Sequence, residues 1–236
     1  MSNEGISKEE LIKKRTPSEL WNWLIEKVAQ LGSTNEGMKD LRLQKGLVKQ
    51  LMEEIGPLAI FGMHKYADNN QILLQPVIGN QAYDAVVTDL RTNPASQTYI
   101  EITQSHEGEN DYWRRCELLK KGYVFSHAPV IKTDTKKTKM QVSIPPEATS
   151  VEERVKSELE RILAAAKGKE GKDYPANTSL IILFDDTPPF QEVVDNKKLD
   201  NFVNKNILNL DLRFSALYLV GSGRVIFREF SLIKKI

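Results

Sequence analysis

Two acidic residues interrupt neighbouring segments that otherwise have the composition of β-strands. Asp84 lies in AYDAVV and Glu101 lies in YIEITQ. Side chains alternate between the faces of a strand, so both carboxylates can project from one face if the two strands pair through the short turn between them. Neighbouring carboxylates repel each other, which raises a pKa or requires a cation. The pair predicts a site for Mg²⁺ or Mn²⁺, and the alternative is two ordinary surface acids.

A second acidic pair, Asp185 and Asp186, follows the apolar segment SLIILF. Ligands of open α/β sheets gather at the carboxyl ends of strands, so this pair could serve a different Mg²⁺-dependent phosphotransfer enzyme. Acids in this position more often form a turn or cap the next segment. The glycines of GSGR are followed by alternating strand residues, which favours a hairpin turn over a phosphate-binding loop.

Composition narrows the class of protein without identifying it. The chain has 236 residues, 33 Lys and Arg against 32 Asp and Glu, and one cysteine, Cys116. One cysteine excludes a disulfide framework and a multi-cysteine zinc site. The polar start does not resemble a signal peptide, and no apolar run approaches the roughly 18 residues of a membrane span, so we expect a cytoplasmic protein with no membrane contact. The net charge of +1 means that any nucleic-acid partner must bind a local basic patch.

The elements that must position the acids can be read along the first half of the chain. Thr16, Pro17 and Glu19 predict the start of a helix that ends at Gly32. A second helix is expected from Ser33 toward Ile55, ending before Gly56 and Pro57. Short apolar segments punctuated by Gly, Pro and Asn then predict consecutive strands of an antiparallel meander, at residues 58–66, 71–79, 82–90 and 96–104.

The second half predicts helices that alternate with strands. We expect helices at 108–122, 151–169 and 199–209, and strands at 123–132, 179–186, 214–220 and 224–230, the last two joined as a hairpin. The fold class is therefore α/β, a mixed central sheet with flanking helices in a single domain. Within it we expect a helical N-terminal extension (1–32), a core (33–132), an insertion with a helix (133–175) and the completion of the core (176–236).

This order of elements, with acids on a helix and two strands, resembles the PD-(D/E)XK phosphodiesterases, the restriction-endonuclease-like nucleases. The resemblance covers roughly residues 33–131, with SLIILFDD as the next core element. It implies an αβββαβ core and Mg²⁺-dependent hydrolysis of DNA. It also implies that Asp84, Glu101 and the backbone carbonyl of Ile102 bind the metal. Of the two candidates for the helix acid, Glu54 flanks the apolar face of its helix better than Glu53 does, so Glu54 is preferred.

The sequence departs from the family pattern at its lysine. Tyr83 replaces the proline before the first acid, and Thr103 stands where the family has a lysine that helps to activate water and stabilise the transition state. The adjacent Gln104 points to the opposite face of the strand. The charge could come from another lysine (candidates Lys120, Lys121 and Lys132) or from two metals, or the site could be degenerate. A degenerate chain would be a non-catalytic nucleic-acid-binding or protein-interaction module.

Basic residues gather after the Glu-x-Thr strand and predict where DNA phosphates bind. They are Arg114, Arg115, Lys120, Lys121 and Lys132. The alternative is an ordinary solvated helix face. A homodimer would suit an enzyme that cuts two strands.

Overall fold

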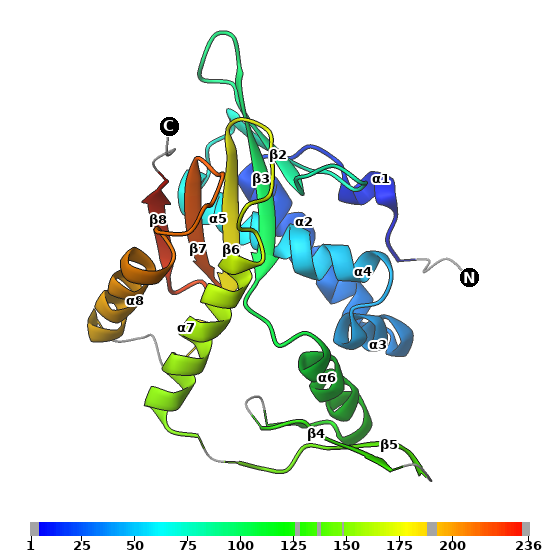
Figure 1. Ribbon diagram of the computed structural model, residues 1–236. Helices are drawn as coiled ribbons and strands as arrows, with labels where there is room; N and C mark the ends of the chain where they lie inside the picture. Colours follow the sequence, from blue (N-terminus) through cyan, green and yellow to red (C-terminus); the bar gives the residue numbers. More distant parts are fainter. Residues whose placement is uncertain (1–4, 126–127, 136–137, 148, 188–192, 233–236) are drawn as a thin grey trace.

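The computed structural model describes residues 5–125, 128–135, 138–147, 149–187 and 193–232. At its centre lies a six-stranded sheet in the order β1-β2-β3-β6-β7-β8 (Figure 1). β1 to β3 form an antiparallel meander, β3, β6 and β7 are parallel, and β8 is antiparallel to β7. The expected mixed α/β sheet is confirmed. The strands are β1 (Ile72–Pro76), β2 (Ala85–Asp89), β3 (Ser96–Gln104), β6 (Thr178–Phe184), β7 (Ala216–Gly221) and β8 (Phe227–Ser231).

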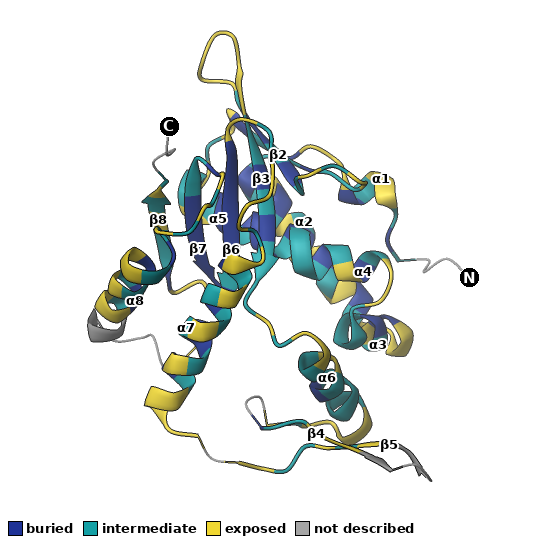
Figure 2. Cartoon of the chain, in the orientation of Figure 1, coloured by how far each residue is buried: buried dark blue, intermediate teal, exposed yellow. Residues whose placement is uncertain are grey.

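Helices cover both faces of this sheet. On one face, α2 (Pro17–Gly32) and α5 (Gly56–Tyr66) bury Leu20 and Phe61 against the apolar side chains of β1, β2 and β3. On the other face, α7 (Val151–Lys167) and α8 (Val193–Asn206) pack against β6 and β7. Figure 2 shows β6 and β7 buried between these layers. No helix in the described ranges is both long and apolar enough to cross a membrane.

The helix predicted to start at Thr16 and Pro17 is α2, and it begins there. The Thr16 hydroxyl accepts a hydrogen bond from the Glu19 backbone N–H at 3.3 Å, and the Glu19 carboxylate accepts one from the Thr16 N–H at 2.9 Å. The helix follows a short α1 (Lys8–Leu11) and buries Leu20, Leu24 and Leu31. The expected N-terminal extension is therefore part of the main core.

The expected strand at residues 58–66 is wrong, because these residues form helix α5. The preceding helix begins later than expected, at the cap Thr34, and is divided into α3 (Asn35–Leu43), α4 (Leu47–Gln50) and a π-helical turn, η1 (Leu51–Ile55). Gly46, with a positive φ of 55°, interrupts the helix between α3 and α4. Pro57 does not end it, because proline is tolerated in the first turn of a helix. A short apolar run does not distinguish a buried helix from a buried strand by periodicity.

The helix expected inside an insertion at 133–175 is a core element. Val155, Ile162 and Ala166 of α7 are buried with the side chains of β6. Parallel strands need a crossover connection, and α7 supplies it between β3 and β6. The elements outside the main sheet are instead α6 (Glu109–Lys121), which packs against α3, and the ribbon of β4 (Ile131–Thr135) and β5 (Thr138–Ser143). Residues 126–127 of the strand expected at 123–132 lie outside the described residues.

The turn between β7 and β8 is the predicted hairpin, and it binds a carboxylate of its own chain. Asp186, which is fully buried, accepts hydrogen bonds from the backbone N–H groups of Gly223 (2.6 Å), Val225 (2.8 Å) and Ile226 (2.8 Å). Asp185 accepts one from the Thr187 N–H at 3.0 Å. These contacts give Asp186 a structural role, so the geometry does not support the alternative phosphotransfer site.

Replacement of Gly221 by Ala is expected to destabilise the protein by about 3 kcal/mol or more, because the new Cβ would overlap the buried Asp186 carboxylate. Urea unfolding measures the change. Gly56→Ala is the control: its Cβ would lie 3.5 Å from the Leu51 carbonyl oxygen, an ordinary contact, and its cost should stay below about 1 kcal/mol. Equal stability of the two variants would contradict this role of Asp186.

Candidate active site

The two predicted acids lie close together where β2 begins. Ala85, the first residue of β2, pairs with Ile100 of β3, and Asp84 directly precedes it. The Asp84 N–H donates to the Ile100 carbonyl at 2.7 Å, and the Asp84 Oδ2 accepts from the Ile102 N–H at 2.7 Å. Asp84 therefore bonds to β3 on either side of Glu101. The expectation that both carboxylates project from one face of the sheet stays a prediction.

Glu54 joins these two acids from η1. Burial, followed by the charge of Asp84, raises the pKa of Glu54 to about 7. Burial, followed by the charge of Glu101, raises the pKa of Asp84 to about 6. Glu53 instead faces Lys49, with 3.7 Å between the Lys49 Nζ and the Glu53 Oε2. Of the two helix acids, the structure brings Glu54 to the strand acids, as the helical face predicts.

A glutamine on β3 holds the turn that carries Glu54. Pro57 has no N–H, so it cannot donate the hydrogen bond that the Glu53 carbonyl would receive in an α-helix. The Gln104 Nε2 donates to that carbonyl at 3.0 Å and approaches the Met52 carbonyl at 3.4 Å. Gln104 therefore points away from the face of Glu101, as strand alternation predicts. It ties η1 to the strand on which Glu101 lies.

A lysine that the sequence analysis did not consider contacts the acids. The Lys169 Nζ lies 2.6 Å from the Glu101 Oε1, and only 18% and 12% of the two side chains are exposed. Lys169 follows α7, whose chain returns toward the start of β6. Leu180 of β6 pairs with Glu101, so the end of the crossover helix lies at the level of that acid. The sequence signal for this contact is a lysine that directly follows the predicted crossover helix.

The lysines proposed to replace the one missing at Thr103 lie elsewhere. Lys121 forms an ion pair with Glu117 of its own helix, and the Lys132 Nζ lies 2.6 Å from a carboxylate oxygen of Glu109. Lys120 is exposed on α6. Thr103 lies on the same face as Glu101, opposite Ile182 of β6. The prediction of a lysine from α6 or from the loop after it is wrong, because Lys169 is the lysine that contacts Glu101.

The donor groups suit a hard cation in type. Within the described part of the chain, no three His, Cys, Asp or Glu side chains converge on one point that could hold a metal ion. Asp84 and Glu101 offer carboxylate oxygens, and the Ile102 carbonyl leaves the strand on the same side as its N–H, toward Asp84. Mg²⁺ and Mn²⁺ prefer such oxygens. Burial is the main cause of the raised pKa of Asp84 and of Glu54, and the charge of a neighbouring carboxylate adds to it in each case.

The predicted nucleic-acid-binding residues are not one surface. Arg114 is buried, with 7% of the residue exposed, and donates to Glu107 at 2.9 Å, to Asp111 at 2.8 Å and to the Ala128 carbonyl. The assignment of Arg114 to phosphate binding is wrong, since its donors face protein acceptors. Arg115 is half-buried, whereas Lys120, Lys121 and Lys132 extend along α6 and β4.

Arg114 belongs to a buried ion network that the sequence analysis missed. Glu107 joins Arg114 to Arg161 of α7, with 2.7 Å between the Arg161 Nη1 and the Glu107 Oε1. Arg161 in turn pairs with Glu158, which also accepts from Ser105 and from the Asp185 N–H at 3.1 Å. Burial raises the pKa of Glu158, and the Ser105 hydroxyl and Arg161 oppose that effect. The network joins α6 to α7.

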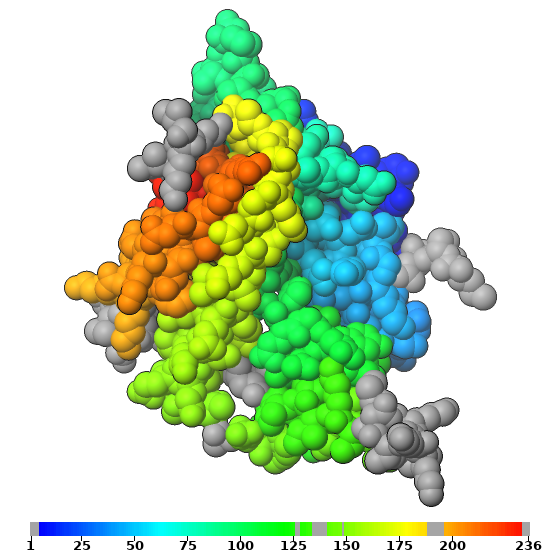
Figure 3. All heavy atoms as spheres, viewed as in Figure 1, coloured from blue at the N-terminus to red at the C-terminus, as the bar shows by residue number. Residues whose placement is uncertain are grey.

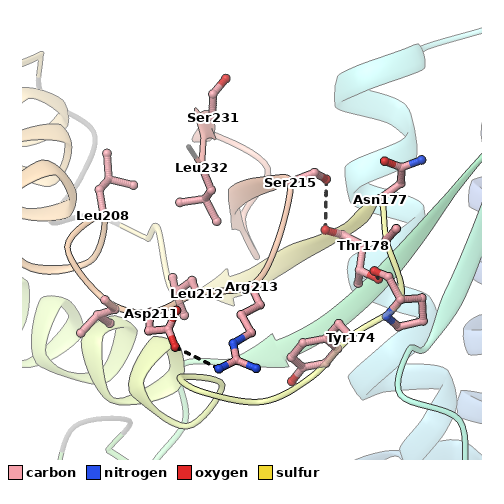
Figure 4. A pocket seen from close by; sticks show the side chains of 13 residues that line it. Tyr174, Asn177, Thr178, Leu208, Asp211, Leu212, Arg213, Ser215, Ser231 and Leu232 are labelled. Atoms are coloured by element: carbon pink, nitrogen blue, oxygen red, sulfur yellow. Dashed lines mark hydrogen bonds and ion pairs between the residues drawn. The ribbon is translucent and has the colours of Figure 1, made fainter. Parts of the chain in front are cut away.

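A cavity of about 710 Å³ lies beyond Tyr174, at the ends where β6 and β7 begin (Figure 4). Burial raises the pKa of Tyr174 to about 12, and the charges of Glu101 and Asp84 contribute. The cation of this cavity, Arg213, is already paired with Asp173 and Asp211.

Comparisons of the chain with protein-family models, with curated protein sequences and with solved structures found no significant match.

The contribution of Asp84 and Glu54 to the stability of the metal-free protein is expected to fall as pH rises. The unfolded chain releases the protons of Asp84 and Glu54 near pH 4, whereas the folded chain holds them until pH 6 to 7, so the free energy of unfolding decreases between about pH 4 and 7. Glu54→Gln should reduce this decrease by on the order of 1 kcal/mol, allowing for solvent screening of a half-buried group. Urea unfolding in EDTA at several pH values measures it. The exposed Glu36→Gln is the control, and an unchanged pH dependence in Glu54→Gln would count against the crowding of these acids.

Gln104→Met should destabilise the protein by about 1–2 kcal/mol, because it leaves the Glu53 carbonyl without its donor while roughly preserving side-chain volume. The matched control is Gln97→Met at an exposed position of the same strand, where the change should stay within about 0.5 kcal/mol. Thermal and urea unfolding report both. Equal effects at the two positions would show that the Gln104 hydrogen bonds do not stabilise η1.

Proposed function

We propose that this protein is a metal-dependent phosphodiesterase, a restriction-endonuclease-like nuclease that acts on DNA with Mg²⁺ or Mn²⁺. One observation carries the proposal. Asp84, just before β2, bonds to β3 on either side of Glu101, and the Lys169 ammonium contacts Glu101. Two acids and a lysine in this relation are the chemical groups of the family that the sequence resembles. The lysine comes from the end of α7 instead of from position 103.

The charge balance of the site supports a divalent cation. Asp84, Glu101 and Glu54 contribute three negative charges when all are ionised, and Lys169 contributes one positive charge. The remaining charge equals that of one divalent ion in magnitude. Burial, followed by the charge of the neighbouring acids, raises the pKa of Glu54 and of Asp84, and a bound cation would offset both effects.

Each residue then has a distinct role. Asp84, Glu101 and the Ile102 carbonyl would hold the metal, which when bound supplies Lewis-acid charge and lowers the pKa of water. Glu54, with a pKa of about 7, is suited to accept a proton from the attacking water near neutral pH. Lys169 is placed to donate hydrogen bonds to a phosphoryl oxygen as negative charge develops there. Thr103 carries no charge, so Lys169 would supply the positive charge of the site.

Asp84→Asn, Glu101→Gln and Lys169→Met should each lower the rate of Mg²⁺-dependent DNA nicking by at least about 100-fold, because each removes a charge that acts at the phosphate or the metal. Nicking of supercoiled plasmid, followed by gel electrophoresis, measures the rate. Lys167→Met, at an exposed position two residues before Lys169, is the matched control and should retain the rate of the unmodified protein.

Two outcomes would contradict the proposal. Full activity of Lys169→Met would remove the lysine from the mechanism, and full activity of Asp84→Asn would remove the site. An unmodified protein that binds DNA but does not nick it with Mg²⁺ or Mn²⁺ would instead be the non-catalytic DNA-binding module.

A further inference from the structure

A groove of about 450 Å³ lies between the turn that joins α3 to α4 and the start of α6. Lys45, Lys49 and Glu53 line one wall, and His106 and Arg115 line the other. In Figure 3 the surface of residues 35–50 adjoins that of α6. The groove is thus formed where the N-terminal helices meet the elements outside the main sheet.

Both walls of the groove are connected to the acidic site through the chain. Glu53 lines the groove, and the next residue, Glu54, belongs to the acidic site. His106 lies two residues after Gln104, the last residue of the strand that carries Glu101. A DNA strand with one phosphate at the acids could therefore continue into this groove.

The acids of the groove are occupied by protein cations. Glu53 pairs with Lys49, and the Glu109 carboxylate accepts from Lys132 at 2.6 Å and from the Trp113 Nε1 at 3.0 Å. Asp111 accepts from Arg114 at 2.8 Å and from the Glu107 N–H at 2.6 Å. The negative charge in these walls is already compensated.

Lys49 is paired with Glu53, but Arg115, Lys45 and His106 each keep a donor atom without a partner among the described residues. The Nε of Arg115 is buried and has no hydrogen-bond acceptor among the described residues. A buried donor without an acceptor costs free energy, so a ligand that drew the Arg115 guanidinium into the groove would remove that cost. Lys45 is exposed and forms no ion pair within the described part of the chain. The His106 Nδ1 accepts from the Gly108 N–H at 3.1 Å, which leaves the Nε2 as the outward donor.

The start of α6 adds to this positive potential. Gly108 caps the helix without a side chain, so no hydroxyl or carboxylate of the capping residue covers the first N–H groups. The N-terminus of a helix favours anions, and a guanidinium with a lysine suits phosphate oxygens. The combination favours a phosphate group over a neutral ligand.

We propose that this groove binds a backbone phosphate of the DNA strand, adjacent to the phosphate at the acidic site, through Lys45, His106 and Arg115. The proposal rests on the proposed function for its substrate class. It adds a subsite that positions the strand and that includes two residues, Lys45 and His106, outside the basic cluster of the sequence.

The test measures DNA binding separately from cleavage. A fluorescent oligonucleotide duplex is titrated with the full chain in EDTA, by anisotropy, at several salt concentrations. Lys45→Gln and Arg115→Gln should each weaken binding on the order of tenfold near 0.1 M salt and lower the slope of log K against log salt by about 0.9. Lys205→Gln, at an exposed position of α8, is the charge-matched control and should change neither. Arg115→Lys, which keeps the charge, should keep most of the slope.

The outcomes separate this subsite from the nuclease proposal. Unchanged affinity and slope in Lys45→Gln, whose exposed position makes misfolding an unsuitable explanation, would overturn the subsite even if the protein cuts DNA. An unmodified protein that binds no DNA would overturn it as well. Weakened binding in both variants of a protein that does not cut DNA would support the subsite and overturn the nuclease activity alone.

Discussion

The burial of two neighbouring carboxylates, Asp84 and Glu101, is the constraint around which the site is built. Burial raises the pKa of Asp84, and the like charge of Glu101 raises it further. Two contacts offset this cost: the Ile102 N–H donates to Asp84, and Lys169 pairs with Glu101. The third acid, Glu54, adds further negative charge. Its burial beside Asp84 costs stability, so the structure holds it against an unfavourable interaction.

The position of Glu54 depends on a sequence of backbone constraints. Pro57 removes one helical hydrogen bond, η1 widens the helix by a π-turn, and Gln104 supplies a donor from β3 to the Glu53 carbonyl. Single π-turns occur frequently at functional sites. Here the turn is anchored to the strand that carries Glu101, so the helix acid and the strand acid are held by the same strand.

The part of this arrangement that depends on local spacing could be predicted from the sequence. The pairing of β2 with β3 follows from two β-rich segments and a short turn, and the choice of Glu54 over Glu53 follows from the helical face. Lys169 could not be found in this way, because its contact with Glu101 spans 68 positions and depends on where α7 ends above the sheet. The burial of Arg114 could not be predicted for a similar reason, because loops bring its acceptors, Glu107 and the Ala128 carbonyl, to it. The apolar residues in 58–66 show no periodicity that distinguishes a helix from a strand.

The segment containing α6, β4 and β5 begins after Gln104, the last residue of β3, and ends at Ser150, the N-cap of α7. Among its described residues, no strand pairs with the central sheet (Figure 1). Changes of length within β4 and β5 therefore need not alter the pairing of β2 with β3 beside Asp84 and Glu101. The exposed ribbon can diverge during evolution, whereas α6 is held to α7 through Arg114, Glu107 and Arg161.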